Sequence, residues 1–487
     1  MQGVKGARGR GTAGRSHSQA SIRPRAPPPL DNRRFVPLHP CTLAPLHPFS
    51  NCFILGVDDT DSPRGLCTTY LATELIEEFR DFDLIGYPRL VRLNPNIPWK
   101  TRGNGAISLT FGKGAGRPFG VGDIEGNDVS AYRRAQSCQI DLQDILERAD
   151  QTVLANSARG EKRTNPAVFA ASRPPPEKLY IDAVRRLVRP SDVVRALSLG
   201  KGRLWSWRTH RGVRGIVGAT AAAAWPGRRR TFELIWYRQR SRWGTPRNVG
   251  FDSVKRMDRR FRSTFNNIDE RNRHIVIAPH SPCPVLFGVR ASRPDELEAA
   301  ARTVDAGEAA DRRLLFATNQ GTDDHLQKMM VAAVRPFMSP VISGRVSSKP
   351  RTERGGHVFF GLEDRTGSLV CAAFEPTKEF RNVVRRLLPG DIVEAAGGVH
   401  RMPLTLNLEK LVLRKLAAAS IPKKPSCPLC GRSMKSIGRD AGFRCRRCRT
   451  RAGPKDAVNV PLARHIVLGR YEVPKCARRH LSRPFER

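Results

Sequence analysis

Three aspartates lie within four residues of one another, at Asp58, Asp59 and Asp61, directly after the apolar run Cys52–Val57. Carboxylates this close repel one another unless a divalent cation neutralises them, and Mg²⁺ favours oxygen ligands with nucleotide phosphates completing its shell. A helix-capping turn also suits aspartate, but such a cap uses a single carboxylate. The spacing alone leaves both interpretations open, and no GxxxxGK[ST] phosphate-binding loop occurs in the chain.

Two nearby features could contact phosphate. Lys100 and Arg102 lie in the glycine-rich loop 99–105, whose backbone could approach phosphate oxygens. Thr68 begins the helix that follows the acidic loop, where its hydroxyl would face the positive end of that helix. A solvated basic turn and ordinary helix capping are the simpler interpretations of these residues.

Four cysteines form the most specific pattern in the chain. Cys427 with Cys430 and Cys445 with Cys448 are two CxxC pairs separated by fourteen residues. Four thiolates at this spacing close a tetrahedral zinc site with no ligand position left for water, so the metal is expected to be structural. An iron–sulfur cluster is the alternative, whereas a redox pair needs only one CxxC. The sequence therefore predicts a zinc ribbon over 421–452.

The predicted ribbon is strongly basic. It carries ten Lys and Arg against one Asp, and Arg444, Arg446 and Arg447 flank the second CxxC pair. The whole chain has a formal charge of +40, from 85 Lys and Arg against 45 Asp and Glu, and a polyanion is the usual partner that relieves such self-repulsion. We expect these arginines to contact nucleic-acid phosphates. No membrane is expected, because the longest apolar run, 215–225, is far too short to cross a bilayer.

These residues need elements that position them. A buried strand over 52–57, an amphipathic helix over 68–80 and a strand over 106–111 predict an α/β domain at 52–214. The next segment, 215–335, is predicted to be ferredoxin-like, because its elements follow the order β-α-β-β-α-β. Those six elements are expected at Thr231–Tyr237, Ser253–Arg262, His274–Ala278, Val285–Arg290, Asp295–Val304 and Arg313–Thr318.

Short strands replace this pattern toward the C-terminus. Three strands, a helix and two further strands are the order of an OB-fold, a β-barrel that binds single-stranded nucleic acid, and the helix distinguishes it from SH3-like barrels. We therefore predict an OB-fold over 338–418. Its elements are expected at Val341–Val346, His357–Leu362, Ser368–Ala373, Lys378–Leu388, Asp391–Ala396 and Leu404–Leu413.

The two ends of the chain differ from the rest. Residues 1–51 hold eight Lys and Arg, one Asp and a proline-rich stretch; they are interpreted as a disordered basic arm, with a transit peptide as the alternative. Residues 453–487 are interpreted as a basic tail. Eleven cysteines without a secretory leader favour a reducing compartment, so a cytoplasmic protein is expected.

Six segments carry long motifs: Gly56–Tyr70, Tyr87–Asn96, Pro98–Gly105, Trp243–Arg247, Thr264–Asn267 and Asn319–His325. Together they resemble one family, the archaeal tRNA-isoleucine 2-agmatinylcytidine synthetases. The resemblance covers roughly residues 52–452 and includes both the acidic loop and the glycine-rich loop. One conservative departure is Leu66, where the family pattern has methionine.

The resemblance implies an activity. Family members attach agmatine, a decarboxylated arginine, to C2 of the wobble cytidine of a CAU anticodon, so that an isoleucine tRNA reads AUA. ATP is cleaved to AMP, the C2 oxygen is phosphorylated, and the agmatine amine displaces the phosphate. Members contain a kinase-like α/β domain, a ferredoxin-like domain, an OB-fold and a zinc ribbon, so a multidomain α/β and α+β protein is expected. Thr68 matches the threonine that becomes autophosphorylated.

The resemblance and the charge pattern also suggest roles for the acidic and glycine-rich loops. Asp58, Asp59 and Asp61 would hold Mg²⁺. Lys100 and Arg102 would then lie against the phosphates of ATP, since phosphoryl transfer depends mainly on positioning and charge neutralisation.

Other contacts are less well defined by the sequence. Gly215 and Gly218 could approach the nucleotide, or could simply begin a strand. Agmatine is a dication, so Asp323 and Asp324 are candidates for its pocket, with a solvated acidic loop as the alternative. The expected partners are ATP, Mg²⁺, Zn²⁺, agmatine and the CAU isoleucine tRNA, bound by a monomer. The competing hypothesis is a non-catalytic single-strand-binding protein, which has no use for clustered aspartates.

Overall fold

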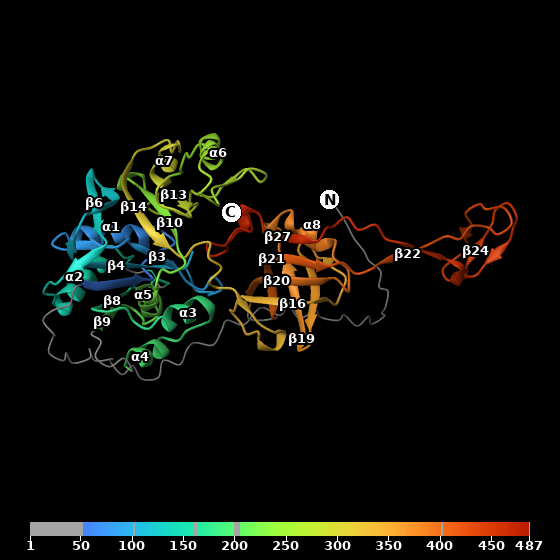
Figure 1. Cartoon of the computed structure of the whole chain (residues 1–487), viewed down its shortest axis with the longest axis horizontal. Helices are drawn as coiled ribbons and strands as arrows, with labels where there is room; N and C mark the ends of the chain where they lie inside the picture. Colours follow the sequence, from blue (N-terminus) through green and yellow to red (C-terminus); the bar gives the residue numbers. More distant parts are fainter. Residues whose placement is uncertain are drawn as a thin grey trace, which may run out of the picture. The chain divides into compact units, whose positions relative to one another are not determined.

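The computed structural model describes residues 52–100, 103–158, 161, 163–198, 205–400 and 403–486. These residues form a large sheet covered by helices, a β-barrel and a small ribbon (Figure 1). The predicted basic arm and Arg102 lie outside the described residues.

One mixed sheet of twelve strands contains most of the first half of the chain. Its strands are β1 (Cys52–Asp58), β2 (Asp83–Ile85), β3 (Arg89–Arg92), β4 (Gly105–Ala115), β5 (Phe119–Ile124), β6 (Asn127–Tyr132), β7 (Arg134–Gln136), β8 (Ala167–Ala171), β9 (Trp205–Thr209), β10 (Thr231–Arg238), β13 (Val285–Ala291) and β14 (Ala310–Thr318). Their order is β13-β10-β14-β5-β6-β2-β4-β1-β8-β9, with β3 and β7 paired off this path.

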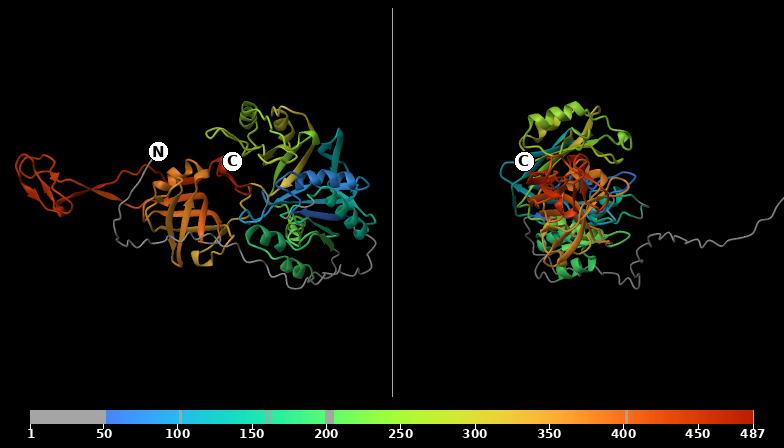
Figure 2. Two further views of the ribbon diagram at one scale, coloured as in Figure 1. Left: turned by 180° about the vertical axis from the view of Figure 1, so that it is seen from behind. Right: turned by 90° about the vertical axis from the view of Figure 1, so that its right-hand side faces the viewer.

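Helices cover both faces of this sheet (Figures 1 and 2). They are α1 (Thr68–Glu78), α2 (Leu142–Ala155), α3 (Lys178–Arg185), α4 (Pro190–Ser198), α5 (Gly215–Ala224), α6 (Phe251–Arg260) and α7 (Leu297–Arg302). Along β1, Phe53 and Leu55 join the core that contains α1 and α2, whereas Ile54 joins the core that contains α3, α4 and α5. Successive strand residues point to opposite faces, so a strand buried on both sides has the apolar run predicted at 52–57.

The predicted segments 52–214 and 215–335 contribute to the same sheet. β14 pairs antiparallel with β5 and parallel with β3, which joins strands of the two segments directly. Helix α5, which begins at Gly215, packs against β1 of the first segment. The predicted boundary at 214/215 therefore separates two segments of the chain, but the strands of both segments form one continuous sheet.

One expected strand of the segment 215–335 is wrong. Residues 274–278 form only the two-residue β12 (His274–Ile275), which pairs with β11 (Ile268–Asp269) outside the main sheet. Prolines at 279, 282 and 284 follow at once, and proline cannot donate a ladder hydrogen bond. The remaining three strands pair antiparallel in the order β13-β10-β14, with α6 and α7 in the expected places along the chain.

The OB-fold prediction is confirmed by a closed barrel. Strands β16 (Pro340–Val346), β18 (Val358–Asp364), β19 (Gly367–Ala373), β20 (Ile392–Val399) and β21 (Thr405–Lys415) follow the predicted order, with α8 (Phe380–Arg385) between β19 and β20. The β16–β18 pairing closes the barrel, and β19 pairs parallel with β21. The short strands β15 (Gln327–Lys328) and β17 (Arg351–Thr352) extend the same sheet.

Residues 453–487, predicted as a basic tail, contribute two strands that pair with other parts of the chain. Strand β27 (Gly469–Glu472) pairs antiparallel with β21 of the barrel. Earlier in this segment, β26 (Val458–Pro461) pairs antiparallel with β22 (Ser420–Lys423), which precedes the ribbon cysteines in the sequence. Each of these strands has four residues, too few to show a clear alternation of apolar and polar residues. Pairing with strands distant in the sequence stabilises them. None of the described helices is long and apolar enough to span a membrane.

Candidate active site and zinc ribbon

The position of Asp58 follows from close packing between β1 and α5. Gly56 and Asp58 lie on the face of β1 that meets this helix. A Cβ at Gly56 would overlap the carbonyl of Ala219, and a Cβ at Gly218 would overlap the Asp58 carboxylate. Glycine at these two positions therefore lets α5 approach β1 closely. As a result, the carboxylate of Asp58 lies beside the first turn of α5, and Gly218 belongs to that turn and not to a strand.

Asp59 is held from the same helix terminus. Its backbone is left-handed, with φ of 58°, which aspartate tolerates better than most residues. Arg214, the residue before α5, donates to Asp59 Oδ2 from Nε at 3.0 Å and from Nη2 at 2.8 Å. The N-terminus of an α-helix carries partial positive charge and attracts anions. Asp58 and Asp59 thus lie at the positive end of α5.

Asp61 makes a different contact, at the start of α1. Its Oδ1 accepts from the backbone N–H of Thr68 at 2.6 Å and from the Thr68 hydroxyl at 3.1 Å. The Thr68 hydroxyl in turn accepts from the hydroxyl of Thr60 at 3.0 Å, and Thr68 is buried. The capping interpretation is therefore correct for Asp61, but it does not account for the other two aspartates.

The electrostatics of Asp58 and Asp59 favour a bound cation. Burial raises the pKa of Asp58 well above its usual range, and the neighbouring carboxylates of Asp59 and Asp61 raise it further. Burial also raises the pKa of Asp59, although the Arg214 guanidinium opposes this shift. Arg214 forms an ion pair with Asp59, and a further positive charge beside Asp58 would stabilise the ionised form of both carboxylates.

The three aspartates do not by themselves form a closed metal site. Among residues 52–486 as far as they are described, the four ribbon cysteines are the only group of three or more His, Cys, Asp or Glu whose ligand atoms all lie within 4.8 Å of one another. Oxygens from a nucleotide would therefore have to complete a Mg²⁺ shell at the aspartates, which is the usual arrangement for this ion.

Lys100 lines a cavity of about 360 Å³ together with Arg92, Arg479 and His480. Its ammonium donates to the carbonyl of Pro95. Burial lowers the pKa of the Arg92 guanidinium, whereas the carboxylate of Glu233 opposes this shift. The predicted phosphate contact Arg102 lies outside the described residues.

Asp323 and Asp324 both have partners within the chain. Lys410 Nζ donates to Asp323 Oδ2 at 2.5 Å. The Tyr180 hydroxyl donates to Asp324 Oδ2 at 2.5 Å, and Arg185 Nε donates to the Asp324 carbonyl at 3.0 Å. The pair is thus not a solvated acidic loop, since these bonds join it to α3 and to the barrel strand β21.

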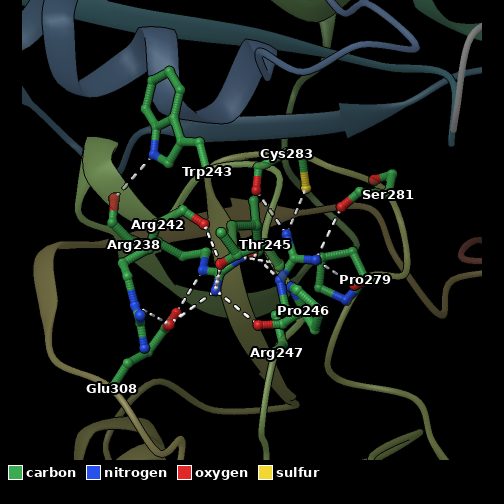
Figure 3. Close-up of polar contacts among 11 residues, drawn as sticks. Arg238, Arg242, Trp243, Thr245, Pro246, Arg247, Pro279, Ser281, Cys283 and Glu308 are labelled. Carbon is green, nitrogen blue, oxygen red and sulfur yellow. Dashed lines mark hydrogen bonds and ion pairs between the residues drawn. The ribbon is translucent and has the colours of Figure 1, made fainter.

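The motif Trp243–Arg247 holds the loop 279–283 through hydrogen bonds of Arg247 (Figure 3). The Arg247 guanidinium donates to the carbonyls of Pro279, Ser281 and Cys283 at 2.8, 2.9 and 2.6 Å. A Cβ at Gly65 would lie 3.2 Å from the carbonyl of Pro282 in that loop. Arg247 therefore holds residues 279–283 against the turn that links the aspartates to α1.

The ribbon cysteines are arranged for one metal ion. Cys427, Cys430, Cys445 and Cys448 place their sulfurs within 4.8 Å of one another. Each pair forms a tight turn: the N–H of Gly431 donates to the carbonyl of Cys427 at 2.8 Å, and the N–H of Arg449 donates to the carbonyl of Cys445 at 3.0 Å. Four thiolates around one centre are the donor set of a structural zinc site.

Arg444, Arg446 and Arg447 are all exposed beside the second cysteine pair. The ribbon core beneath them is small, and consists of the cysteines with Met434, Phe443 and Ala452. Three short strands, β23 (Lys435–Ser436), β24 (Phe443–Arg444) and β25 (Arg451–Ala452), complete it. So small a core depends on a metal for its stability, and the metal would thereby position the arginines.

Two important residues were not found from the sequence. Arg214 belongs to none of the motifs, and it pairs with Asp59 from its position directly before the first residue of α5. Glu233, in β10, is 3 % exposed and pairs with Arg290 at 2.9 Å. A single acid inside the apolar strand Thr231–Arg238 is a signal that could have identified Glu233, because an isolated charge is rarely buried without a partner.

An acidic loop at a helix terminus, combined with an OB-fold and a cysteine ribbon, defines a nucleic-acid-binding protein with a candidate catalytic centre. Known domain families match along the chain: the TiaS TCKD domain at 54–201, the TiaS FLD domain at 213–325, an OB-fold nucleic acid binding domain at 341–410 and the TiaS C-terminal zinc ribbon domain at 424–466. Two relatives are named as the isoleucine-tRNA 2-agmatinylcytidine synthetase TiaS. The Archaeoglobus fulgidus protein is 39% identical over 438 residues, which are 89% of this chain and 97% of that protein. The Pyrococcus horikoshii protein is 40% identical over 439 residues, which are 88% and 96%.

Solved structures agree with these relatives. A complex of TiaS with its isoleucine tRNA and ATP has a TM-score of 0.76 at 36% identity, and covers 90% of this chain and 97% of its own. A complex of TiaS with the same tRNA, AMPCPP and agmatine has a TM-score of 0.74 at 33% identity, with the same coverage. The chain belongs to the TiaS family of isoleucine-tRNA 2-agmatinylcytidine synthetases.

Proposed function

We propose that this chain is an ATP-dependent ligase that attaches agmatine to C2 of the wobble cytidine in the CAU anticodon of an isoleucine tRNA. The observation that carries the proposal is the extent of the similarity. It runs through about nine tenths of the chain, at 36% identity to a structure solved with an isoleucine tRNA and ATP, and the acidic loop lies within the matched region. ATP, agmatine and this tRNA are the partners, and the cytoplasm is the proposed location.

Asp58 and Asp59 form the proposed Mg²⁺–nucleotide site, together with the N-terminus of α5. Burial raises the pKa values of both carboxyl groups, and Mg²⁺ bound with nucleotide phosphates would stabilise their ionised forms. Gly215 and Gly218 leave the backbone of the first turn of α5 open to phosphate oxygens. Phosphoryl transfer then depends on alignment and charge neutralisation, which this rigid strand–helix junction provides.

Thr68 and Asp61 form the proposed phosphoryl acceptor site. The Thr68 hydroxyl already donates to Asp61 Oδ1 at 3.1 Å, so this carboxylate is placed to accept the hydroxyl proton when the oxygen attacks a phosphoryl group. A phosphate on Thr68 would lie at the N-terminus of α1, where the helix dipole stabilises it. The resemblance that assigns autophosphorylation to this threonine is thus consistent with its surroundings.

The proposed reaction activates the cytidine before agmatine attacks. Transfer of a phosphoryl group to the C2 oxygen of the cytidine makes that oxygen a good leaving group. The primary amine of agmatine then adds to C2, the C2–O bond breaks, inorganic phosphate leaves, and the amine loses its proton. The domains at 52–214 and 215–335, kinase-like and ferredoxin-like in this proposal, would carry these steps.

Asp323 and Asp324 remain the proposed contacts for the agmatine cation, and Asp324 is the better candidate. Asp323 is already paired with Lys410, whereas the partner of the Asp324 carboxylate is the neutral Tyr180 hydroxyl. A hydroxyl can rotate away when a guanidinium arrives, because the ion pair is the stronger interaction.

The OB-fold at 338–418 and the ribbon at 421–452 are proposed to bind the tRNA outside the reaction centre. Zn²⁺ on the four cysteines would hold the exposed Arg444, Arg446 and Arg447 in position for phosphate contacts. In this proposal the basic ribbon binds tRNA phosphates and the acidic loop binds Mg²⁺ and nucleotide, so one chain contains both.

Mass analysis of tRNA nucleosides tests the proposed function. The protein is incubated with ATP, agmatine and the CAU isoleucine tRNA, and the tRNA is digested to nucleosides. We expect one cytidine to become heavier by one agmatine less one water, only when all three substrates are present. A protein that binds the tRNA tightly but leaves every nucleoside unchanged would instead be the non-catalytic binding protein.

A further inference from the structure

The C-terminal segment 475–486 contacts parts of the chain that are distant in the sequence. It lies outside the four matched domain models, the last of which ends at residue 466. The N–H groups of Gly321 and Asp323 donate to the carbonyls of His480 and Leu481, both at 2.8 Å. Leu481 is buried in the core that contains α3, α4 and α5. This segment is therefore packed against the large sheet.

Within this segment, Arg479 joins two other parts of the chain. Its Nε forms an ion pair with Glu409 of β21 at 3.2 Å, and its Nη1 donates to the side-chain oxygen of Asn96. The Asn96 side-chain amide donates to the carbonyl of Met338 at 3.0 Å and to the hydroxyl of Ser339 at 2.9 Å, directly before β16. One guanidinium thus connects the C-terminal segment with the barrel and with the residues that follow β3.

A glycine in β20 leaves room for this contact. A Cβ at Gly398 would lie 2.0 Å from Asn96 Oδ1 and 2.8 Å from Arg479 Nη1, so a larger residue would overlap the hydrogen bond between them. The ion pair is buried on its acidic side, because Glu409 is 4 % exposed. Burial would raise the pKa of Glu409, but the charges of Arg479 and His325 lower it to about 2. The carboxylate is therefore ionised at neutral pH, and the ion pair persists there.

Residues 93–96, which follow β3, connect this contact with the acidic loop. A Cβ at Gly218 would overlap the Asp58 carboxylate and would also lie 2.8 Å from Leu93 Cδ1, so Leu93 packs at the first turn of α5. Asn96 follows Leu93 by three residues, which span at most about 11 Å. A displacement of the barrel at Asn96 would therefore reach the acidic loop through one short segment.

We propose that Arg479 is a positioning residue for the modification of the tRNA. It holds the barrel against residues 93–96, so that a tRNA bound by the barrel presents its anticodon to the acidic loop. This inference rests on the proposed function, in which the barrel binds the tRNA and the acidic loop carries the chemistry. Arg479 acts through Asn96 and Glu409 and takes no part in the chemistry itself.

Arg479→Gln tests this role, with Arg483→Gln as its matched control. Both changes remove one positive charge from the same segment, and Arg483 is exposed, so a general effect of charge on tRNA binding is common to both. The kcat and KM of agmatine incorporation and the affinities for tRNA and ATP are measured on the full chain. Backbone hydrogen exchange at 336–340 reports on the contact itself, because the Asn96 amide binds this segment.

The double variant Arg479→Gln with Glu409→Gln separates positioning from a loss of folding stability. Without Arg479, the buried Glu409 carboxylate loses a compensating charge, and such a change destabilises a protein. The second substitution removes that carboxylate charge but restores no contact with Asn96. A positioning role therefore predicts that the double variant is as slow as Arg479→Gln.

We expect Arg479→Gln to lower kcat about tenfold or more and to speed exchange at 336–340, with KM and both affinities near those of Arg483→Gln. Equal kcat values for these two variants would overturn the proposal. Recovery of kcat in the double variant would also overturn it, since the unpaired charge would then be the cause. So would a weaker affinity for tRNA or ATP at unchanged kcat, which would make Arg479 a ligand contact. Each of these outcomes leaves the proposed function standing, because nucleoside analysis of the wild type tests that function separately.

Discussion

Gly218→Ala isolates the contact between α5 and the acidic loop. The new Cβ would overlap the Asp58 carboxylate and would lie 2.8 Å from Leu93 Cδ1. The carboxylate must therefore turn away, or α5 must move off β1. In either case the geometry of Asp58 at the helix terminus is lost, while its charge is kept.

The effect on stability is expected to be small compared with the effect on activity. Replacing glycine by alanine inside a helix contributes about 1 kcal/mol of stability, and overpacking a close contact costs about 1–3 kcal/mol. The net change in the free energy of unfolding is then a loss of roughly 0–2 kcal/mol. A displaced catalytic carboxylate, in contrast, commonly lowers the rate about a hundredfold.

Agmatine incorporation into the tRNA and thermal unfolding are the assays, with Gly120→Ala as the control. A Cβ at Gly120 would meet nothing within 4 Å, so this variant should keep both rate and stability. The double variant Gly218→Ala with Asp58→Asn should be no slower than Asp58→Asn alone, because both changes act on the same carboxylate. A Gly218→Ala protein with the wild-type rate, or a fully additive double variant, would refute the reasoning.

Four further predictions follow from the same contacts. Asp59→Asn should lower agmatine incorporation about a hundredfold or more while tRNA affinity stays near that of the wild type; retained turnover would contradict a metal role. Thr68→Ala should abolish incorporation of radiolabelled phosphate into the protein, and Thr68→Ser should preserve it; label that persists in Thr68→Ala must lie on another residue. Cys445→Ser should lower both zinc content and tRNA affinity but leave ATP binding intact, and unchanged zinc content would disprove the ligand assignment. Lys100 has a pKa of about 8, so its charged fraction falls about tenfold between pH 7 and pH 9. A phosphate ligand needs the charged form, so pyrophosphate affinity should fall by about that factor in the wild type but not in Lys100→Arg, and equal profiles would exclude a contact with Lys100.

Local patterns predicted the elements whose signal lies within a few residues. The structure confirms the strand at 52–57, the helix after the acidic loop and the strands of the OB-fold. Each of these elements has a recognisable pattern of apolar residues, or turn-forming residues at its ends, within its own sequence. The cysteine site was predicted for the same reason: two CxxC pairs carry their geometry in their spacing, and the sulfurs do converge.

Features that depend on distant partners could not be predicted in this way. Strand β27 is four residues long and is stabilised by pairing with β21, so no property of Gly469–Glu472 alone identifies it. Arg214 contacts Asp59 across 155 positions of the chain. The aspartates also differ in their contacts: Asp61 binds the first residue of α1 and Asp59 binds the residue before α5. These contacts depend on where the two helices begin, so the spacing of the aspartates could not distinguish them.

A crystal grown with Mn²⁺ in place of Mg²⁺ and a non-hydrolysable ATP analogue tests the central claim most directly. The anomalous signal of manganese locates the ion independently of the rest of the map. We predict a peak in contact with the carboxylate of Asp58 or Asp59, with the analogue's phosphates at the first turn of α5. A well-ordered analogue bound elsewhere, with neither metal nor phosphate at these aspartates, would contradict the account.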